Sequence, residues 1–268
     1  MPIIEVLGIN THILELNHEA EEAVIMVHGM FGNLAQFYLT LGPHLSKKYR
    51  VVMYDIKSHG RSDKSDKGYD LISLTDDMVN LMNALEIASA HFIGFSYGAL
   101  MVLKFAMRFP ERVSKIALIE TPPRPDKPLK NKGEYNFDDF ITFADILPEQ
   151  VKKNFLRNKK QIVKTYKMYE YIYNWTSFVN DMNNEKELER DELFGIEHEI
   201  LLLYGTRSIC LPMAYKLCTE LKDPKVVIKD GDHGFFMNHC AEVSNDLDIF
   251  FTLGREDETL TSVNKIKH

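Results

Sequence analysis

Short apolar runs alternate with longer amphipathic stretches along much of the chain. Four runs have the length and the Val, Ile and Phe content of buried strands: residues 23–27, 51–55, 91–95 and 113–119. Three stretches between them repeat apolar residues three and four positions apart, which predicts helices with one buried face: 36–47, 76–85 and 99–109. Residues 3–7 and 11–16 predict an opening hairpin. This alternation predicts an α/β fold whose mostly parallel sheet is covered by helices on both faces.

The pattern changes after Glu120. A proline-rich stretch over 121–128 leads into helical sequence over 137–173, with breaks near Pro148 and Asn158. Strand-like runs return only at 200–204 and 225–229, and a final helix is expected over 241–253. We therefore expect a core formed by residues 1–120 and 196–253, a helical insertion over 121–195, and a polar, frayed tail over 254–268.

Composition narrows the class of protein. The 268 residues are 45% hydrophobic, enough for one large α/β domain. The net charge of −7 and the lack of a basic stripe argue against a nucleic-acid partner. No apolar run approaches 18 residues and the N-terminus lacks a basic region, so we expect no membrane span and no signal peptide. The three cysteines have no metal-type spacing, which favours reduced thiols and a cytoplasmic location: Cys210, Cys218 and Cys240.

The most informative motif is Gly94-Phe95-Ser96-Tyr97-Gly98, which joins a predicted strand to a predicted helix. A serine at so tight a turn is held at strained backbone angles and presents its hydroxyl above the sheet edge. The flanking glycines let strand and helix approach closely. Ser96 is therefore the candidate nucleophile, and the alternative is a protein that has kept the turn and lost the activity.

Other segments appear in the order expected with this motif. They are His28-Gly29-Met30-Phe31-Gly32-Asn33 after one strand, Asp55 to Asp63 after the next, and Gly231-Asp232-His233-Gly234 near the end. Over residues 3–120 and 196–253 the chain resembles the α/β-hydrolase superfamily. The resemblance implies the α/β-hydrolase fold with a helical cap over the active site, and is far less specific for the substrate.

The resemblance makes His233 the candidate base, because it follows the last core strand on a loop that can bring an imidazole over Ser96. His239 is a weaker rival. His28 is expected to brace the loop after its strand, and His59 resembles the family's structural turn.

The acid is less straightforward. The family's usual Gly-x-x-Asp stretch corresponds here to Gly205 and the residues after it, and Ser208 occupies the aspartate position. Glu120 ends the strand after the serine helix, next to the Ser96 turn, where haloalkane dehalogenases and similar marine luciferases place a glutamate acid. Glu120 is the candidate acid. The alternatives are a solvated strand-end carboxylate and Asp232, which is poorly placed beside His233.

Two backbone amides are expected to form the oxyanion hole, those of Tyr97 and Met30, with Phe31 as a less favoured donor. The side chains of Met30, Phe31 and Tyr97 are expected to line an apolar floor. In the insertion, four residues at helical spacing form a stripe along one face of a predicted helix: Ile162, Tyr166, Tyr169 and Tyr173. This stripe either packs into a core or forms the roof of the substrate pocket. A roof of aromatic rings would favour a bulky or elongated apolar acyl group.

These residues predict a serine hydrolase that cleaves a carboxylic ester or thioester through an acyl-enzyme, with a Ser96-His233-Glu120 triad. The expected partner is a small molecule, including a carrier-bound acyl group, and the mechanism needs no metal or organic cofactor. Three alternatives stay open: acyl transfer to an alcohol, amine or carrier thiol; hydrolysis of a carbon–carbon bond in a dione; and a non-catalytic ligand-binding protein. Oligomeric state is not predicted.

Overall fold

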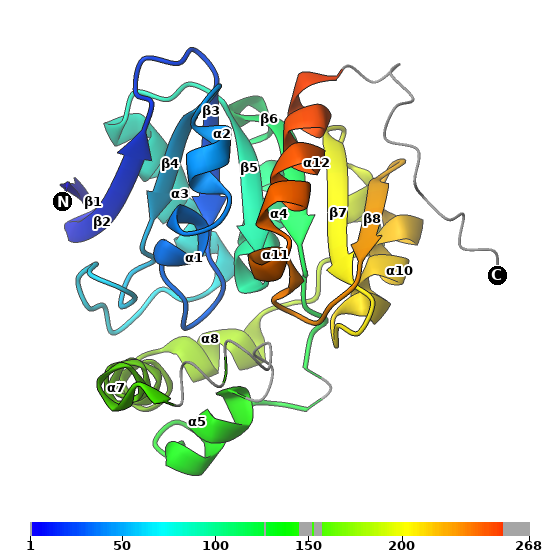
Figure 1. Ribbon diagram of the computed structural model, residues 1–268. Helices are drawn as coiled ribbons and strands as arrows, with labels where there is room; N and C mark the ends of the chain where they lie inside the picture. Colours follow the sequence, from blue (N-terminus) through cyan, green and yellow to red (C-terminus); the bar gives the residue numbers. More distant parts are fainter. Residues whose placement is uncertain (1, 126, 145–151, 153–156, 254–268) are drawn as a thin grey trace.

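The computed structural model describes residues 2–125, 127–144, 152 and 157–253 (Figure 1). The predicted break at Pro148 and the predicted tail over 254–268 lie outside these residues. An eight-stranded sheet runs through the molecule in the order β1-β2-β4-β3-β5-β6-β7-β8. Its strands are β1 Ile3–Val6, β2 Ile9–Leu16, β3 Ala23–Val27, β4 Arg50–Tyr54, β5 Ala90–Phe95, β6 Val113–Ile119, β7 Glu199–Gly205 and β8 Lys225–Lys229.

The pairings of β1 with β2 and of β2 with β4 are antiparallel, and all other pairings in the sheet are parallel. The carboxyl ends of β3 to β8 therefore meet at one edge, which we call the carboxyl edge. Alternate strand residues bury against opposite faces: Val24 and Met26 belong to one apolar cluster, and Ile25 and Val27 to the other. The predicted fold class is confirmed.

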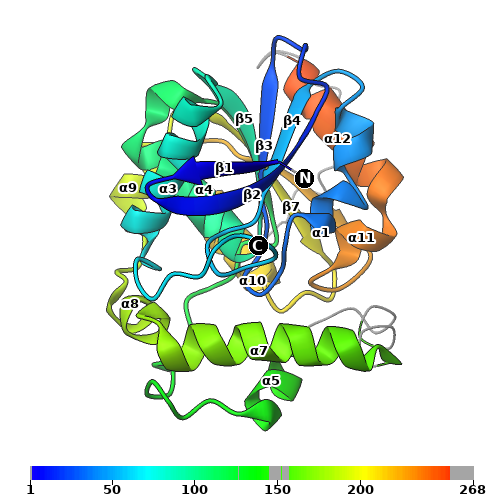
Figure 2. The ribbon, with the colours of Figure 1, turned by 90° about the vertical axis from the view of Figure 1, so that its left-hand side faces the viewer.

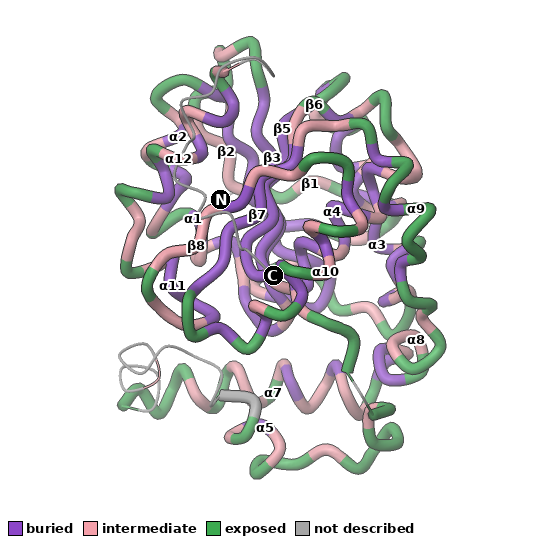
Figure 3. The backbone as a smooth tube through the Cα atoms, turned by 90° about the vertical axis from the view of Figure 1, so that its right-hand side faces the viewer, coloured by how far each residue is buried: buried purple, intermediate pink, exposed green. Residues whose placement is uncertain are grey.

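Helices cover both faces of the sheet (Figures 1 and 2). One face carries α1 Ala35–Tyr38, α2 Gly42–Leu45, α11 Phe235–Asn238 and α12 Cys240–Thr252. The other carries α3 Leu71–Ala84, α4 Tyr97–Arg108, α9 Arg190–Phe194 and α10 Leu211–Glu220. The most fully buried residues run along the central strands between these layers (Figure 3).

Two predicted helices differ from those observed. The helix expected over 36–47 is instead the separate α1 and α2, because Pro43 lacks an amide hydrogen and fits only the first turn of a helix, its position in α2. The helix expected from Asp76 begins at Leu71, where the Asp70 side chain caps it by accepting a 2.8 Å hydrogen bond from the Ser73 amide.

In the described part of the chain, three helices lie beyond the carboxyl edge: α5 Phe137–Ala144, α7 Lys159–Trp175 and α8 Phe178–Asn184 (Figures 1 and 2). The predicted break at Asn158 is the start of α7, where its side chain accepts a hydrogen bond from the Gln161 amide. Within the described ranges, no helix combines the length and the apolar character needed to cross a bilayer.

Candidate active site

Ser96 occupies the turn between β5 and α4 with φ 53° and ψ −121°, a backbone conformation that is strained for any residue other than glycine. Its amide donates to the Ile119 carbonyl at 2.9 Å. A Cβ on Gly94 would lie 2.6 Å from Ala99 Cα, and one on Gly98 would collide with the Val27 carbonyl oxygen. The two glycines thus allow the close strand–helix approach that the motif predicted.

His233 lies between Ser96 and Glu120. It follows β8, with its Nε2 3.1 Å from Ser96 Oγ and its Nδ1 3.2 Å from Glu120 Oε2. The side chain is 9% exposed, and its ring packs against Phe95 with 5.1 Å between ring centroids. The structure thus brings the predicted nucleophile, base and acid into one chain of hydrogen bonds at the carboxyl edge.

Glu120 follows β6, beside the strand that leads to Ser96, and its φ is 56°. The side chain is fully buried, and Oε1 accepts a 2.6 Å hydrogen bond from the Gly205 amide. Among the described residues, no lysine or arginine forms an ion pair with this carboxylate. The buried carboxylate is therefore held by hydrogen-bond donors and by its contact with His233, and not by a lysine or arginine.

Ser208, at the position where the family usually has aspartate, donates its hydroxyl hydrogen to Glu120 Oε2. Its oxygen also accepts a 3.0 Å hydrogen bond from the Cys210 amide. The site therefore uses both positions, one for a carboxylate and one for a hydroxyl that binds it. No sequence pattern indicated this contact, because it depends on the path of the turn after β7.

Cys210 is a further residue of the site that the sequence did not identify. Its Sγ lies 3.4 Å from His233 Nδ1. Burial, reinforced by the Glu120 charge, raises the pKa of the thiol to about 12, so the thiol stays protonated near neutral pH. Donor atoms of Glu120, Cys210 and His233 lie within 4.8 Å of one another and offer oxygen, sulfur and nitrogen ligands to a metal ion. Cysteine spacing missed this group because its members follow three different strands.

Two buried histidines hold the loop after β3. The Phe31 amide donates to His59 Nε2 at 3.0 Å, and the Ile56 amide donates to His28 Nε2 at 3.0 Å. Each ring therefore carries its proton on Nδ1, which contacts a carbonyl oxygen. Burial lowers the pKa of His28 and lowers that of His59 to about 3, so both rings are neutral. Since the Phe31 amide is occupied, Met30 is the better placed donor of the two considered for the oxyanion hole.

A cavity of about 600 Å³ opens at Ser96 between the sheet and the inserted helices. Met30, Phe31, Tyr97 and Tyr173 are among the residues that line it. Tyr166 and Tyr169 instead pack against Phe140 of α5, at centroid distances of 5.6 and 5.4 Å. They belong to an apolar cluster, which agrees with the first of the two arrangements considered for the stripe. Helical spacing identified the stripe but not the surface it faces.

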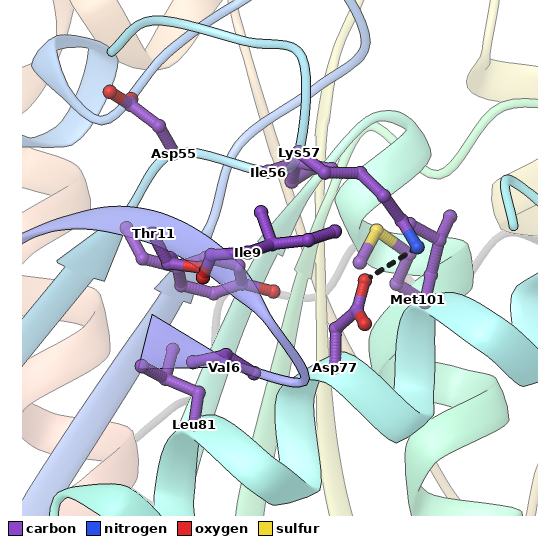
Figure 4. A pocket seen from close by; sticks show the side chains of 11 residues that line it. Val6, Ile9, Thr11, Asp55, Ile56, Lys57, Asp77, Leu81 and Met101 are labelled. Carbon is purple, nitrogen blue, oxygen red and sulfur yellow. Dashed lines mark hydrogen bonds and ion pairs between the residues drawn. The ribbon is translucent and has the colours of Figure 1, made fainter. Parts of the chain in front are cut away.

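The remaining candidates lie elsewhere. His239 Nδ1 faces Glu242, and Asp232 accepts a hydrogen bond from the Gly234 amide. A separate hollow between the opening hairpin and α3 has a volume of only about 10 Å³ (Figure 4). Lys57 and Asp77, which both line it, form an ion pair at 2.8 Å.

A sequence profile of the alpha/beta hydrolase fold matches residues 22–239. The chain belongs to the α/β-hydrolase fold family. Among solved structures, the chain is similar to an enol-lactonase from Burkholderia xenovorans LB400, with a TM-score of 0.78 and 21% identity, over 94% of this chain and 100% of that one. At that identity the likeness establishes the fold alone.

Curated proteins with a similar sequence match this chain over only part of its length. A 2-hydroxy-6-oxononadienedioate/2-hydroxy-6-oxononatrienedioate hydrolase from Comamonas testosteroni is 33% identical over 118 residues, 42% of this chain and 41% of its own length. Bifunctional epoxide hydrolase 2 from Sus scrofa is 30% identical over 168 residues, 59% of this chain and 30% of its own length. The matches thus span less than half the length of these relatives, both of which are named as hydrolases.

Proposed function

We propose that this protein is a serine hydrolase that cleaves a carboxylic ester or thioester through an acyl-enzyme. The observation that carries the proposal is the bridging position of His233, 3.1 Å from Ser96 Oγ on one side and 3.2 Å from Glu120 on the other. A nucleophile, a base in reach of it and a carboxylate that orients the base are the parts that acyl transfer requires.

In the first half of the reaction, Ser96 Oγ attacks the carbonyl carbon while His233 Nε2 takes the hydroxyl proton. The carbonyl π electrons move to oxygen, and the amides of Tyr97 and Met30 donate hydrogen bonds to the resulting oxyanion. Collapse breaks the bond to the alcohol or thiol, which leaves with the proton from His233. Glu120 holds the ring with its other proton on Nδ1 and stabilises the imidazolium.

In the second half, water attacks the acyl carbon and His233 Nε2 takes a proton from it. The second tetrahedral intermediate collapses, the acid leaves and Ser96 regains its proton. The predicted cap, residues 121–195, would exclude bulk water while the acyl-enzyme forms. α9 lies within that range yet packs on α4 and α10, so α5, α7 and α8 are the helices proposed to act as the lid.

The test combines labelling with turnover. A fluorophosphonate probe should label wild-type protein at Ser96, and p-nitrophenyl esters of short and long acids should show a burst followed by steady hydrolysis. Ser96→Ala should abolish both while its unfolding curve stays close to wild type. A folded wild-type protein that is neither labelled nor active would favour the ligand-binding alternative.

Carbon–carbon bond hydrolysis of a dione is the second candidate, favoured by the similarity to the Comamonas testosteroni hydrolase, whose name denotes an oxo-dienedioate substrate. A vinylogous diketone acid offered beside matched esters separates the two. Acyl transfer is tested in the same assay by adding an alcohol, an amine or a pantetheine thiol and measuring how the acyl group partitions between acceptor and water.

A further inference from the structure

The mouth of the Ser96 cavity is basic although the chain as a whole carries a net charge of −7. The cavity walls include buried apolar side chains, among them Leu188 and Met213. Four cationic side chains also line it, and they are exposed or half-buried, which places them toward solvent: Arg124, Lys127, Lys186 and Lys216. The cavity is therefore apolar inside and positively charged where it opens.

Two carboxylates also line the cavity, and each already has a partner. Glu185 Oε2 accepts a 2.9 Å hydrogen bond from the Leu71 amide, at the start of α3. Glu187 pairs with Lys216, whose hydrogen bond and charge, with a smaller contribution from Arg124, lower the pKa of the Glu187 carboxyl. Both carboxylates are therefore already engaged within the protein.

Lys127 and Lys186 have no ion-pair partner among the described residues, and Arg124 has only its longer-range interaction with Glu187. They come from separate elements: Arg124 and Lys127 from the proline-rich segment after β6, and Lys186 from the link between α8 and α9. Cations that converge on a cavity from different elements, with too few carboxylates to neutralise them, form a positive field that attracts an anion.

We propose that the substrate of this site is amphipathic, with an apolar acyl part held near Ser96 and an anionic carboxylate or phosphate at the end that reaches the basic mouth. The inference rests on the proposed function for the bond that is cleaved. The anionic group can belong to either part of the substrate. It is a carboxylate at the far end of the acyl chain, or a phosphate in the leaving group of a carrier or coenzyme thioester.

Two matched pairs of substrates distinguish these sources. The carboxylate pair is the mono-p-nitrophenyl ester of decanedioic acid and its methyl-capped, neutral counterpart. The phosphate pair is decanoyl-coenzyme A and the neutral decanoyl thioester of N-acetylcysteamine. In at least one pair, the anionic member should have a KM at least about fivefold lower than that of the neutral member at low salt. The reason is that several part-exposed charge pairs between substrate and protein each add modestly to the free energy of binding. The preference should shrink in about 0.5 M NaCl.

A charge-reversed variant and a matched control locate the effect. The double variant Lys127→Glu, Lys186→Glu should lose the anionic preference, so that the KM of the anionic member is no longer below that of the neutral member of the same pair. Lys47→Glu reverses a single charge at an exposed lysine before β4, at the opposite edge of the sheet, and should keep the preference.

Binding to Ser96→Ala, measured by calorimetry with the same four compounds, separates failure of this inference from failure of the proposed function. Equal affinity and equal KM for both members of both pairs would overturn the inference while leaving ester hydrolysis intact. Tighter binding of an anionic member without any turnover by wild type would support the basic mouth and count against the proposed chemistry.

Discussion

The hydroxyl of Ser208 donates a hydrogen bond to Glu120 Oε2, the same carboxylate oxygen that faces His233 Nδ1. The position that usually supplies the acid thus supports a carboxylate arriving from the neighbouring strand β6. This relationship explains why the two positions cannot be exchanged one at a time. An aspartate at 208 would place a second carboxylate against the first, and two carboxylates in contact cannot both stay ionised without a large cost.

We therefore expect Ser208→Asp to be more damaging than Ser208→Ala. Ser208→Ala removes one donor from a buried carboxylate, a loss of about 1.5–3 kcal/mol in the free energy of unfolding. Ser208→Asp adds like-charge repulsion to that loss, so its urea midpoint and its kcat on p-nitrophenyl esters should both fall below those of Ser208→Ala. A Ser208→Asp enzyme with higher kcat than wild type would show that Glu120 is not the acid.

Glu120→Gln tests the acid directly. The glutamine amide can donate to His233 Nδ1, which favours the ring tautomer that cannot accept the Ser96 proton, so kcat should fall by about 10³–10⁴-fold. Asp232→Asn is the matched control, because Asp232 adjoins His233 in sequence but bonds the Gly234 amide. Its kcat should stay within about twofold of wild type, and equal losses in the two variants would contradict the assignment.

The positions of Ser96 and Glu120 could be predicted because they depend on a local turn motif and on the pairing of neighbouring parallel strands. A strained strand–helix turn fixes Ser96, and parallel strands bring the residue after β6 beside it. The contacts of Ser208 and Cys210 could not be predicted, because they depend on how the chain turns after β7. Periodicity identified the tyrosine stripe of α7 without showing that Tyr166 and Tyr169 face α5. Pro43 divided a helix that apolar spacing alone predicted as continuous.

Gly98→Ala should damage both stability and activity. The added Cβ would meet the Val27 carbonyl oxygen, part of the rigid backbone of β3, so α4 and Ser96 would have to shift. Overpacking of this kind costs about 1–3 kcal/mol or more, and displacement of Ser96 should lower kcat by at least about tenfold. Gly195→Ala, whose Cβ makes ordinary 3.4 Å contacts and whose φ is negative, should change neither. Unfolding curves and ester kinetics on both variants check the prediction.

Zinc ions should inhibit hydrolysis. His233 Nδ1 lies 3.4 Å from Cys210 Sγ and 3.2 Å from Glu120 Oε2, which are close to the ligand separations of a tetrahedral zinc ion. Binding there would deprotonate the thiol and occupy His233 Nδ1, so Nε2 would carry the ring proton and could no longer accept the proton of Ser96. Cys210→Ala should raise the zinc concentration for half inhibition by about tenfold or more. Equal zinc sensitivity of Cys210→Ala and wild type would place the inhibitory ion elsewhere.

Folding stability should fall in mild acid because three buried histidines are neutral in the folded protein. Burial lowers the pKa of His28, that of His59 to about 3 and that of His91 to about 4. Below about pH 6.5 the unfolded chain binds protons that these rings do not. Their contribution is therefore complete above pH 6.5 and declines as pH falls toward the folded values, by up to about 1.4 kcal/mol per histidine per pH unit.

Urea unfolding at several values between about pH 7.5 and 5 measures this slope, in a range above the ordinary titration of most carboxylates. His59→Gln removes one titrating ring, so its unfolding free energy should depend less steeply on pH, by about the contribution of one histidine. The variant should nevertheless be less stable than wild type at every pH. Unfolding free energies that stay constant across this range would mean that the rings accept protons in the folded state. The Phe31 amide would then lose its acceptor, and the loop that presents the Met30 amide would be released before the protein unfolds.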